Sequence, residues 1–275
     1  MPSPKTQKND IILKDLSRSI KEAYDAERKN LPKDRTVYGQ SSFYFTYHVA
    51  MELLKQKIIP GKKILDIGCS GGLIWKFLQE EDVDLEYYGL DLIFEALKSN
   101  KKYHLDVKLF NASATELPFQ DETFEYIISC ETLEHIPDTV TTLKEIFRVL
   151  KPQGRVVLSV PNYGNPILAA IAKFYRVFLG NPHFAMGEQV FEHHFTTIYL
   201  DDLFQKLSFR IIDSIGAHYV PNKDALVWIA EVIPFFRRIV KWPYFYSNTR
   251  FKTHKGFKRF ATNIFYLLEK PKIRS

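Results

Sequence analysis

The pattern of hydrophobic and polar positions predicts that strands and helices alternate along most of the chain. Short apolar runs, typical of strands buried in a parallel sheet, are separated by segments whose apolar residues recur every three or four positions, as on one face of a helix. The pattern predicts strands at residues 64–67, 85–92, 106–110, 124–130, 154–161, 209–220 and 261–270. It predicts helices at residues 10–30, 41–57, 73–81, 93–102, 139–152 and 197–207.

This alternation indicates the α/β class, in which right-handed crossover helices connect parallel strands. We expect residues 1–58 to form an N-terminal helical cap and residues 59–275 to form the domain that contains the sheet. Helices should cover both faces of this sheet, because its strands are apolar on both sides.

Composition and charge narrow the class of protein. The chain has 275 residues, of which 45% are hydrophobic and 25% charged, as in a soluble globular protein. Two cysteines, a polar N-terminus and the lack of a long uncharged apolar run favour a cytoplasmic location. The net charge of +6 is uneven, because residues 216–275 hold 12 Lys and Arg against 3 Asp and Glu. This basic region favours contact with anionic partners.

A glycine-rich bend follows the first predicted strand. Asp66 and Gly68 end that strand, and Gly72 opens the next helix. Glycines at this point allow positive φ and close approach of a ligand to the backbone. The bend lacks the Lys and Ser or Thr of a phosphate-binding loop, and it does not match the dinucleotide fingerprint. The acid at Asp66 suits a ligand that carries an amine.

Asp91 ends the next predicted strand. An acid at this place can accept hydrogen bonds from both hydroxyls of a ribose. The alternative is that Asp91 only caps the helix that follows. The glycine-rich bend 19 residues before Asp91 favours the ribose.

Residues 62–162 resemble the class I S-adenosylmethionine-dependent methyltransferases, of the small-molecule and lipid type found in ubiquinone biosynthesis. The resemblance rests on the ordered motifs ILDIGCSGG, YYGLDL, ASATELPFQDETFEYIISCETLEHIPD and LKEIFRVLKPQGRVVLSVPN. It implies that S-adenosylmethionine is the cofactor. By this resemblance Asp66, Gly68 and Gly72 hold its amino acid part, Asp91 holds the ribose, and Leu92 packs against the adenine.

The sequence departs from the family pattern in two places. Ser70 stands at the middle glycine of the bend, and Ser113, followed by Ala114, stands where the family usually has an acid that meets the adenine amino group. A neutral Ser113 should make a weaker contact than an acid, and Asn111 is an alternative partner for the adenine. Ser70, Ser113 and Ala114 remain among the expected cofactor-binding residues.

The resemblance also assigns roles to the segment after the fourth strand, which lines the cofactor pocket in this family. We therefore expect Glu131 to contact the cofactor and His135 to face the methyl-transfer site. The alternative for His135 is that it orders the loop through a backbone hydrogen bond.

Further candidate bases precede the helix at residues 197–207. His193 and His194 follow the fifth strand, on the cofactor side of the sheet, and adjacent extended residues point to opposite faces, so only one should reach the site. Both are alternatively surface or packing residues. Tyr38, Tyr47 and His48 give a weaker signal. No cluster has metal-ligand spacing, and methyl transfer requires none, so we expect no metal.

The resemblance implies a Rossmann-like sheet of seven mostly parallel strands, with the last strand antiparallel. N-terminal helices and two insertions, at about 161–195 and 221–259, should then form a cap over the substrate. The second insertion is rich in aromatic and basic residues. It can act as a lid or as a contact with an anionic membrane surface. A nucleic-acid contact is the less favoured alternative, because no recognition module accompanies the insertion.

We therefore expect an S-adenosylmethionine-dependent methyltransferase that methylates an oxygen of a small or lipid-like substrate. One alternative is a nucleic-acid or protein methyltransferase. Another is a cofactor-binding scaffold or regulator that has lost catalysis, an idea to which the departure at Ser113 lends some support. The oligomeric state and the acceptor cannot be inferred from these patterns.

Overall fold

The structure is a computed structural model that describes residues 40–55, 58–103, 107–165, 192–217 and 261–272. The predicted helix at 10–30 lies outside these residues, as do most of the first predicted insertion, nearly all of the second and Tyr38.

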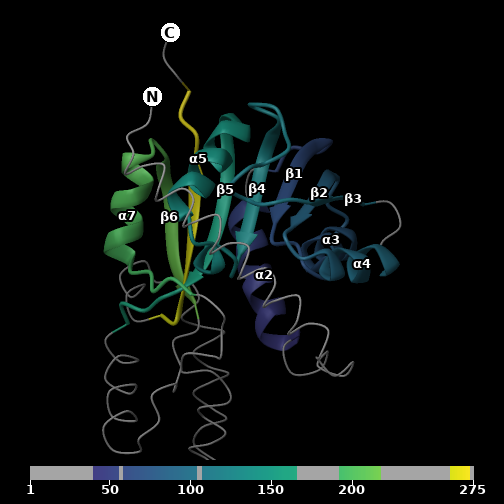
Figure 1. The fold of residues 1–275 in the computed structure, drawn as a ribbon, viewed down its shortest axis with the longest axis horizontal. Helices are drawn as coiled ribbons and strands as arrows, with labels where there is room; N and C mark the ends of the chain where they lie inside the picture. The colour runs from purple at the N-terminus through teal and green to yellow at the C-terminus, as the bar shows by residue number, and fades with distance from the viewer. Residues whose placement is uncertain (1–39, 56–57, 104–106, 166–191, 218–260, 273–275) are drawn as a thin grey trace, which may run out of the picture.

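A seven-stranded sheet in the order β3-β2-β1-β4-β5-β7-β6 forms the centre of the described part (Figure 1). Its strands are β1 (Lys62–Ile67), β2 (Leu85–Asp91), β3 (Lys108–Asn111), β4 (Phe124–Cys130), β5 (Leu150–Pro161), β6 (Arg210–Ala217) and β7 (Asn263–Glu269). Strands β1 to β5 pair in parallel, whereas β7 is antiparallel to both β5 and β6. The predicted seven-stranded, mostly parallel sheet with an antiparallel last strand is confirmed.

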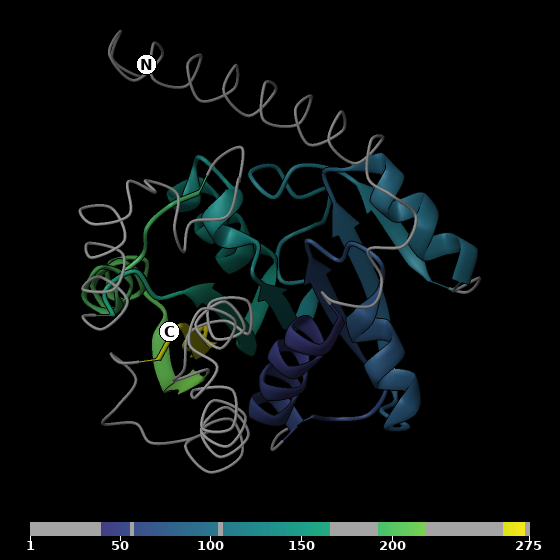
Figure 2. The ribbon, with the colours of Figure 1, turned by 90° about the horizontal axis from the view of Figure 1, so that it is seen from below.

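Helices pack on both faces of this sheet (Figure 2). The helices are α2 (Gln40–Lys55), α3 (Leu73–Glu80), α4 (Phe94–Tyr103), the short 3-10 helix η1 (Leu133–His135), α5 (Thr139–Val149) and α7 (Thr197–Lys206). Apolar residues of α2 and α3 pack in one buried layer, and those of α5 and α7 pack in the layer on the other face. We predicted each of these helices within a few residues of its observed bounds, except the short η1.

The central strands are apolar on both sides because each contributes alternate residues to the two layers. In β1, Leu65 and Ile67 belong to the layer of α5, whereas Ile64 belongs to the layer of α2 on the other face. All three side chains are almost fully buried. This is why continuous apolar runs, and not alternating ones, marked these strands in the sequence.

Helix α2 forms part of the core of the described structure. Its Ala50, Met51 and Leu54 are fully buried in the layer that also contains Phe77 of α3. The boundary of an N-terminal cap at residue 58 stays a prediction, but α2 itself covers the sheet.

Strand β5 begins earlier than its apolar pattern predicted. Helix α5 ends at Val149, and Leu150, which the pattern assigned to the helix, already pairs with Phe124 of β4. Leu150 is fully buried, and its carbonyl accepts a hydrogen bond from Lys270 Nζ at 2.8 Å. This bond with a residue 120 positions away helps to hold the early strand start, and a local pattern cannot reveal it.

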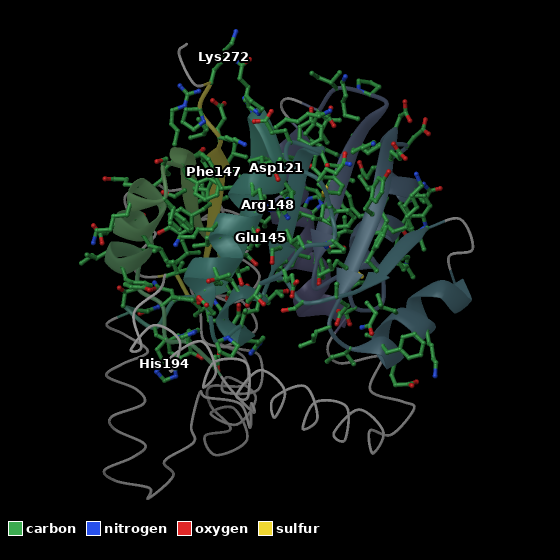
Figure 3. All side chains as sticks on the ribbon, turned by 45° about the horizontal axis from the view of Figure 1, so that its top comes forward. Asp121, Glu145, Phe147, Arg148, His194 and Lys272 are labelled. Atoms are coloured by element: carbon green, nitrogen blue, oxygen red, sulfur yellow. The ribbon has the colours of Figure 1, made fainter. Side chains whose placement is uncertain are left out.

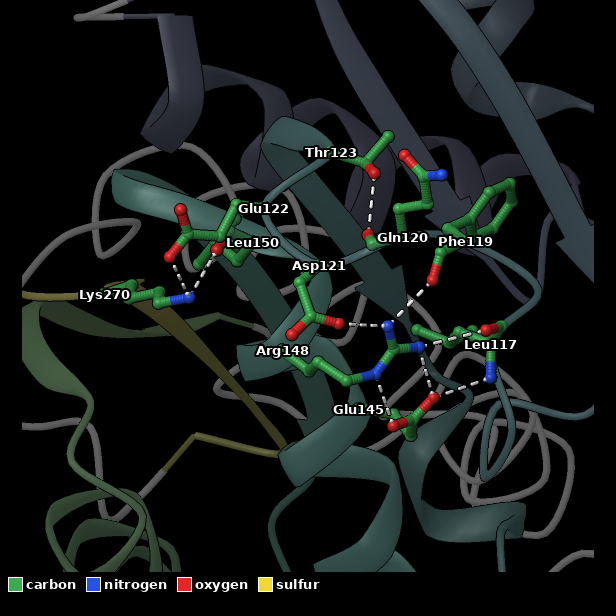
Figure 4. A network of polar contacts seen from close by, with 10 residues as sticks. All are labelled: Leu117, Phe119, Gln120, Asp121, Glu122, Thr123, Glu145, Arg148, Leu150 and Lys270. Carbon is green, nitrogen blue, oxygen red and sulfur yellow. Dashed lines mark hydrogen bonds and ion pairs between the residues drawn. The ribbon is translucent and has the colours of Figure 1, made fainter.

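An arginine network fixes the loop before β4 (Figure 4). Arg148 at the end of α5 donates to the carbonyls of Leu117 and Phe119 and to the carboxylates of Asp121 and Glu145. All five guanidinium N–H groups thus have an acceptor. The same loop continues back to Ser113 and Ala114, so the network anchors one end of a segment in which we predicted cofactor contacts.

Candidate active site

The bend between β1 and α3 has three residues with left-handed backbone. Gly68, Ser70 and Gly72 have φ of 77°, 41° and 79°. A Cβ on Gly68 would lie 2.3 Å from Thr132 Oγ1, so the loop after β4 packs directly on this glycine. Next to it, a Cβ on Gly71 would meet no atom within 4 Å, and the bend is open there. Ser70 adopts a conformation that costs a non-glycine residue about 1 kcal/mol.

The bend rests on β2 at a glycine. A Cβ on Gly89 would lie 2.9 Å from Cys69 Sγ, and both Gly68 and Cys69 donate their N–H to the carbonyl of Leu90, at 2.8 and 3.1 Å. The missing side chain at Gly89 therefore gives Cys69 its place, and the bend lies against the end of β2.

Asp91 lies beside the bend, with each carboxylate oxygen bound to a backbone N–H. Its Oδ2 accepts from Ser70 N at 2.9 Å, and its Oδ1 accepts from Ile93 N at 2.8 Å. The second bond joins Asp91 to the residue directly before α4, so it orders the turn into the helix and caps no N–H group of α4 itself. The first bond holds the carboxylate against the open bend.

Asn111 has a different role from the one considered in the sequence. Its Nδ2 donates to the carbonyls of Asp91 and Leu92, at 3.0 and 2.9 Å, and so ties the end of β3 to the segment after β2. Ser113 Oγ lies 2.7 Å from Thr115 Oγ1 and accepts from Thr115 N, so this hydroxyl orders its own turn. Asn111 is therefore better described as a support for Leu92 than as a replacement for the missing acid.

Asp66 is buried at the base of the bend. Tyr87 Oη donates to Asp66 Oδ2 at 2.8 Å. Burial raises the pKa of Asp66 to about 7; the hydrogen bond from Tyr87 opposes this shift, and the nearby Asp91 adds to it. A cationic group placed against Asp66 would stabilise its ionised form.

Tyr47 of α2 reaches the same region. Burial raises the pKa of its phenol strongly, and the neighbouring Cys130, Asp66 and Glu131 raise it further. Its ring is 9% exposed. His48, the next residue, instead packs against Phe77 with ring centroids 5.7 Å apart, so of this pair only Tyr47 adjoins the bend.

Glu131 connects β4 with β5 and β7. It has φ of 48°, and its carboxylate accepts from Ser159 Oγ at 2.7 Å and from Asn263 Nδ2 at 2.8 Å. Burial raises the pKa of Glu131, which these two hydrogen bonds partly offset. Its carboxylate is thus bound on the side of β5 and β7, and contact with a cofactor remains a prediction.

Glu134 in η1 is a buried acid whose Oε2 has no hydrogen-bond partner among the described residues. Its side chain is 1% exposed, and Oε1 lies 3.7 Å from His135 Nε2. Burial raises the pKa of Glu134 well above that of an ordinary glutamate, and the charges of Glu131 and Glu192 raise it further.

The three predicted histidines lie in different surroundings. His193 Nε2 is 3.0 Å from the carbonyl of Pro137, and its ring stacks on Phe195 with centroids 5.4 Å apart. His194 is exposed and stacks on Tyr163 at 4.2 Å, so the two adjacent rings do have separate environments. His135, near Glu134, is about one quarter exposed. Figure 3 shows His194 at the end of the sheet opposite to Lys272, which follows β7.

The sequence matches known proteins over its central part. Residues 65–158 match the family model of a methyltransferase domain. The chain is 37% identical over 110 residues to a demethylmenaquinone methyltransferase of Geobacillus sp. (strain WCH70), which covers 38% of this chain and 47% of that protein. It is 32% identical over 152 residues to the ubiquinone/menaquinone biosynthesis C-methyltransferase UbiE of Rickettsia massiliae, covering 53% and 49%. The chain carries a class I S-adenosylmethionine-dependent methyltransferase domain.

The methyltransferase domain has the fold of solved methyltransferases. Over 94% of its length the chain is similar to 99% of a Haloferax volcanii methyltransferase that was solved in complex with the Trm112 methyltransferase activator, with a TM-score of 0.63. At 16% identity this similarity concerns the fold alone. The chain spans about half the length of the two curated relatives it matches.

The bend of the methyltransferase domain fits its cofactor, S-adenosylmethionine. Open space at Gly71 lets a ligand approach the backbone, Asp91 presents a carboxylate held by two N–H groups, and Asp66 offers a second acid suited to an amine. Within the described ranges no group of three or more His, Cys, Asp or Glu has a metal-binding arrangement. No helix in the part of the chain that the structure describes is long and apolar enough to cross a membrane.

The structure brings four of the nine predicted cofactor residues together at the bend, namely Asp66, Gly68, Ser70 and Asp91. It also shows a candidate functional residue that the sequence reasoning missed, the buried acid Glu134. Its place in the ETLEHIPD stretch, directly before His135, was the available signal.

Proposed function

We propose that this chain is an active S-adenosylmethionine-dependent methyltransferase whose acceptor is a small or lipid-like molecule with a hydroxyl group. The main support is the contact between Asp91 Oδ2 and Ser70 N, which holds a carboxylate against the open glycine-rich bend. Two curated relatives, named for quinone methylation, agree with such an acceptor.

The cofactor residues have distinct roles in this proposal. Asp66 binds the amine of S-adenosylmethionine, and Asp91 accepts hydrogen bonds from its ribose hydroxyls. Gly68, Ser70 and Gly72 bring the backbone close to the amino acid part. Leu92 and Ala114 contact the adenine from either side, with Ser113 as a neutral neighbour, and Glu131 lies at the side where the acceptor enters.

The bound cofactor supplies a methyl group on a positively charged sulfur, and in-line attack on this carbon yields the methylated acceptor and S-adenosylhomocysteine. The protein must hold the acceptor in line and remove its proton. Glu131 and Glu134, which follow β4, together with Tyr47 of α2 can do both in this proposal, because they are buried polar groups at the carboxyl end of β4.

The acceptor atom is oxygen in the proposal that the sequence suggested. A second candidate is a ring carbon next to a hydroxyl, since the Rickettsia relative is named a C-methyltransferase. Both reactions start from an ionised hydroxyl. A nucleic-acid or protein acceptor has less support, because the Geobacillus and Rickettsia relatives are both named for quinone methylation.

Cofactor binding is tested by titration calorimetry. We expect Asp91→Ala to weaken S-adenosylmethionine binding about 100-fold, because two hydrogen bonds to a carboxylate are lost, each contributing about 1.5 kcal/mol. Asp202→Ala, which removes an exposed acid of α7 paired with Lys206, is the matched control and should bind normally. Binding that is unchanged in Asp91→Ala would contradict the site.

Catalysis is tested by transfer of labelled methyl groups from S-adenosylmethionine into a cell extract that is then fractionated. Label in the lipid or small-molecule fraction supports the proposal, and its position on oxygen or carbon separates the two acceptors. Label in protein or nucleic acid overturns the proposed acceptor class. Cofactor binding with no label in any fraction favours a scaffold or regulator without catalysis.

Peripheral contact with an anionic membrane is a further part of the proposal. It rests on the basic and aromatic composition of residues 221–259, which lie outside the described residues. Co-sedimentation with anionic vesicles at low salt tests it, and no retention of the protein would contradict it.

A further inference from the structure

Three carboxylates gather beside the bend, where the proposed function needs a proton acceptor. Glu131 directly follows β4, Glu134 lies in η1, and Glu192 precedes α7. The charge of Glu192 raises the pKa of both other acids, and Glu131 raises that of Glu134. No Lys or Arg in the described part of the chain forms an ion pair with any of the three.

Two of the three carboxylates have hydrogen-bond donors that account for their position. Glu131 is bound by Ser159 and Asn263, and Glu192 Oε1 accepts from Tyr163 Oη at 2.5 Å. Glu134 differs, because its Oε2 is buried without a partner among the described residues. A buried acceptor of this kind calls for a donor that is absent from the structure, such as a hydroxyl of the substrate.

The position of η1 connects this oxygen with the cofactor. Thr132, directly before η1, packs on Gly68 of the bend, and the backbone carbonyl of Glu134 accepts from His193 N at 2.7 Å. Burial raises the pKa of the Cys130 thiol, and both Asp66 and Glu134 raise it further, so the two acids flank the end of β4. Glu134 thus belongs to a turn that the bend contacts on one side and the segment of His193 holds on the other.

The histidines are less suited to the same task. His193 is held against the carbonyl of Pro137 and the ring of Phe195. His194 stacks on Tyr163 at the surface. Both rings are thus held by protein groups away from the unpartnered oxygen of Glu134.

We propose that Glu134 is the catalytic base of this methyltransferase, which takes the proton from the acceptor hydroxyl through its unpartnered Oε2. The inference rests on the proposed function. As the O–H bond breaks, its proton moves to Glu134 and the oxygen, or the ring carbon conjugated with it, uses an electron pair to bind the methyl carbon. On the carbon path that ring carbon then loses its hydrogen as a proton to solvent, and the oxygen takes a proton back from Glu134. The C–S bond breaks, and its electron pair stays on sulfur in S-adenosylhomocysteine.

The pH dependence follows from the neighbours of Glu134. Burial and two like charges make Glu134 bind its proton more tightly than an ordinary glutamate does, so the rate should rise with pH through this raised pKa. Removing one of the like charges should move the rise to lower pH. The titratable groups around Glu134 are Glu131, Glu192, His135, Tyr163 and Cys130.

The test compares Glu134→Gln with Glu134→Asp and Glu192→Gln in the intact chain. The acceptor is the extract fraction that takes up labelled methyl groups from S-adenosylmethionine. We expect Glu134→Gln to lower kcat at least 100-fold while S-adenosylmethionine binds within twofold of wild type, and Glu134→Asp to recover part of the rate. Glu192→Gln should shift the acid limb of the pH–rate profile to lower pH by about half a unit or more.

A second measurement needs no acceptor. Infrared difference spectroscopy follows protonated carboxyl groups, and the band that is lost in Glu134→Gln should titrate above the range of an ordinary glutamate. A normal titration of this band, or a kcat of Glu134→Gln within threefold of wild type, overturns the proposal. Loss of wild-type activity on adding EDTA also overturns it, because the carboxylates would then hold a metal ion and not move a proton.

Failure of this inference is distinct from failure of the proposed function. If no fraction takes up label, the function fails whatever the infrared titration gives. If Glu134→Gln fails to bind S-adenosylmethionine, two other measurements test the role of Glu134. These are the pH–rate profile of Glu192→Gln and the infrared titration of the Glu134 carboxyl band. An unshifted profile and a normal titration overturn the role of Glu134.

Discussion

Acidic side chains have opposite surroundings at the two ends of the central strands, which we call the two edges of the sheet. At the edge where β5 begins, Glu145 accepts from Arg148 and from Leu117 N, and Arg148 lowers the pKa of Glu145. At the other edge, Asp66 and Glu134 are buried with raised pKa, and Glu134 has an oxygen without a partner among the described residues. The same chemical group thus stabilises the fold at one edge and costs stability at the other.

This difference separates structural acids from candidate functional ones. An acid whose charge is matched within the protein gains nothing from a ligand. An acid that is buried without a matching charge reduces the stability of the free protein, and a bound cation or hydroxyl can recover that energy. The cost at the second edge is therefore an argument for a ligand there, and substitutions at each edge should have opposite effects.

The largest loss of stability from a single substitution at neutral pH is expected where Arg148 pairs with its acceptors, at the end of the sheet where β5 begins. Arg148→Ala should lower the free energy of unfolding by about 3 kcal/mol, because two backbone carbonyls and Glu145 lose their donors in a partly buried site. Urea denaturation measures this change. Lys206→Ala, which removes an exposed partner of Asp202, is the control and should cost less than about 0.5 kcal/mol. A loss below about 1 kcal/mol for Arg148→Ala would contradict the structural role of the network.

Asp66→Asn should have the opposite effect on stability, because above pH 7 it removes a buried charge and should raise the free energy of unfolding. Because the pKa of Asp66 is raised to about 7, the proton on Asp66 stabilises the fold below the ordinary pKa of an aspartate, and this contribution is lost as pH rises through 7. Wild type should therefore lose about 4 kcal/mol between pH 4 and pH 8 that Asp66→Asn does not lose. Urea titrations at both pH values compare the two proteins, and parallel pH profiles would contradict the raised pKa.

The same acid should make cofactor binding depend on pH. Asp66 has to lose its proton to pair with the amine of S-adenosylmethionine, so affinity should fall up to about tenfold per pH unit below 7. Calorimetry in buffers of different ionisation enthalpy should detect release of a proton at pH 6. Asp66→Asn should bind weakly at every pH and release none.

The smallest effect is expected at Ser113. Ser113→Asp introduces the acid that the resembling family usually has, and a carboxylate accepts from the adenine amino group more strongly than a hydroxyl does. Affinity for S-adenosylmethionine should rise about threefold, or about 0.7 kcal/mol. Ser113→Ala is the control, and it should change affinity little because the hydroxyl is bound to Thr115. An Asp variant that binds no better than wild type would place Ser113 outside the adenine contact.

The fold was predictable where neighbouring residues decide the structure. Apolar runs marked the strands, helical spacing marked α3, α5 and α7, and the glycine-rich bend marked the carboxyl end of β1. The resemblance, and not the pattern, supplied the antiparallel β7.

The remaining features depend on contacts between distant residues. Glu131 turns toward β7 because Asn263, 132 positions later, donates to it, and Asn111 binds the backbone at Asp91. Nothing near Glu134 in the sequence signals that its carboxylate is buried without a donor, since that follows from the packing of η1 between the bend and the segment of His193. The sequence could therefore place these residues near the bend, but it could not give the direction of their side chains.

The fit of Cys69 into the space above Gly89 has an evolutionary consequence. A side chain at position 89 and a sulfur at position 69 would claim the same volume, because a Cβ on Gly89 lies only 2.9 Å from Cys69 Sγ. Among homologous sequences the two positions should therefore change together, with a larger residue at 89 accompanied by a smaller one at 69. Such paired substitution would mark lineages in which the bend keeps its packing distance from β2. An alignment of homologous sequences is enough to test for it.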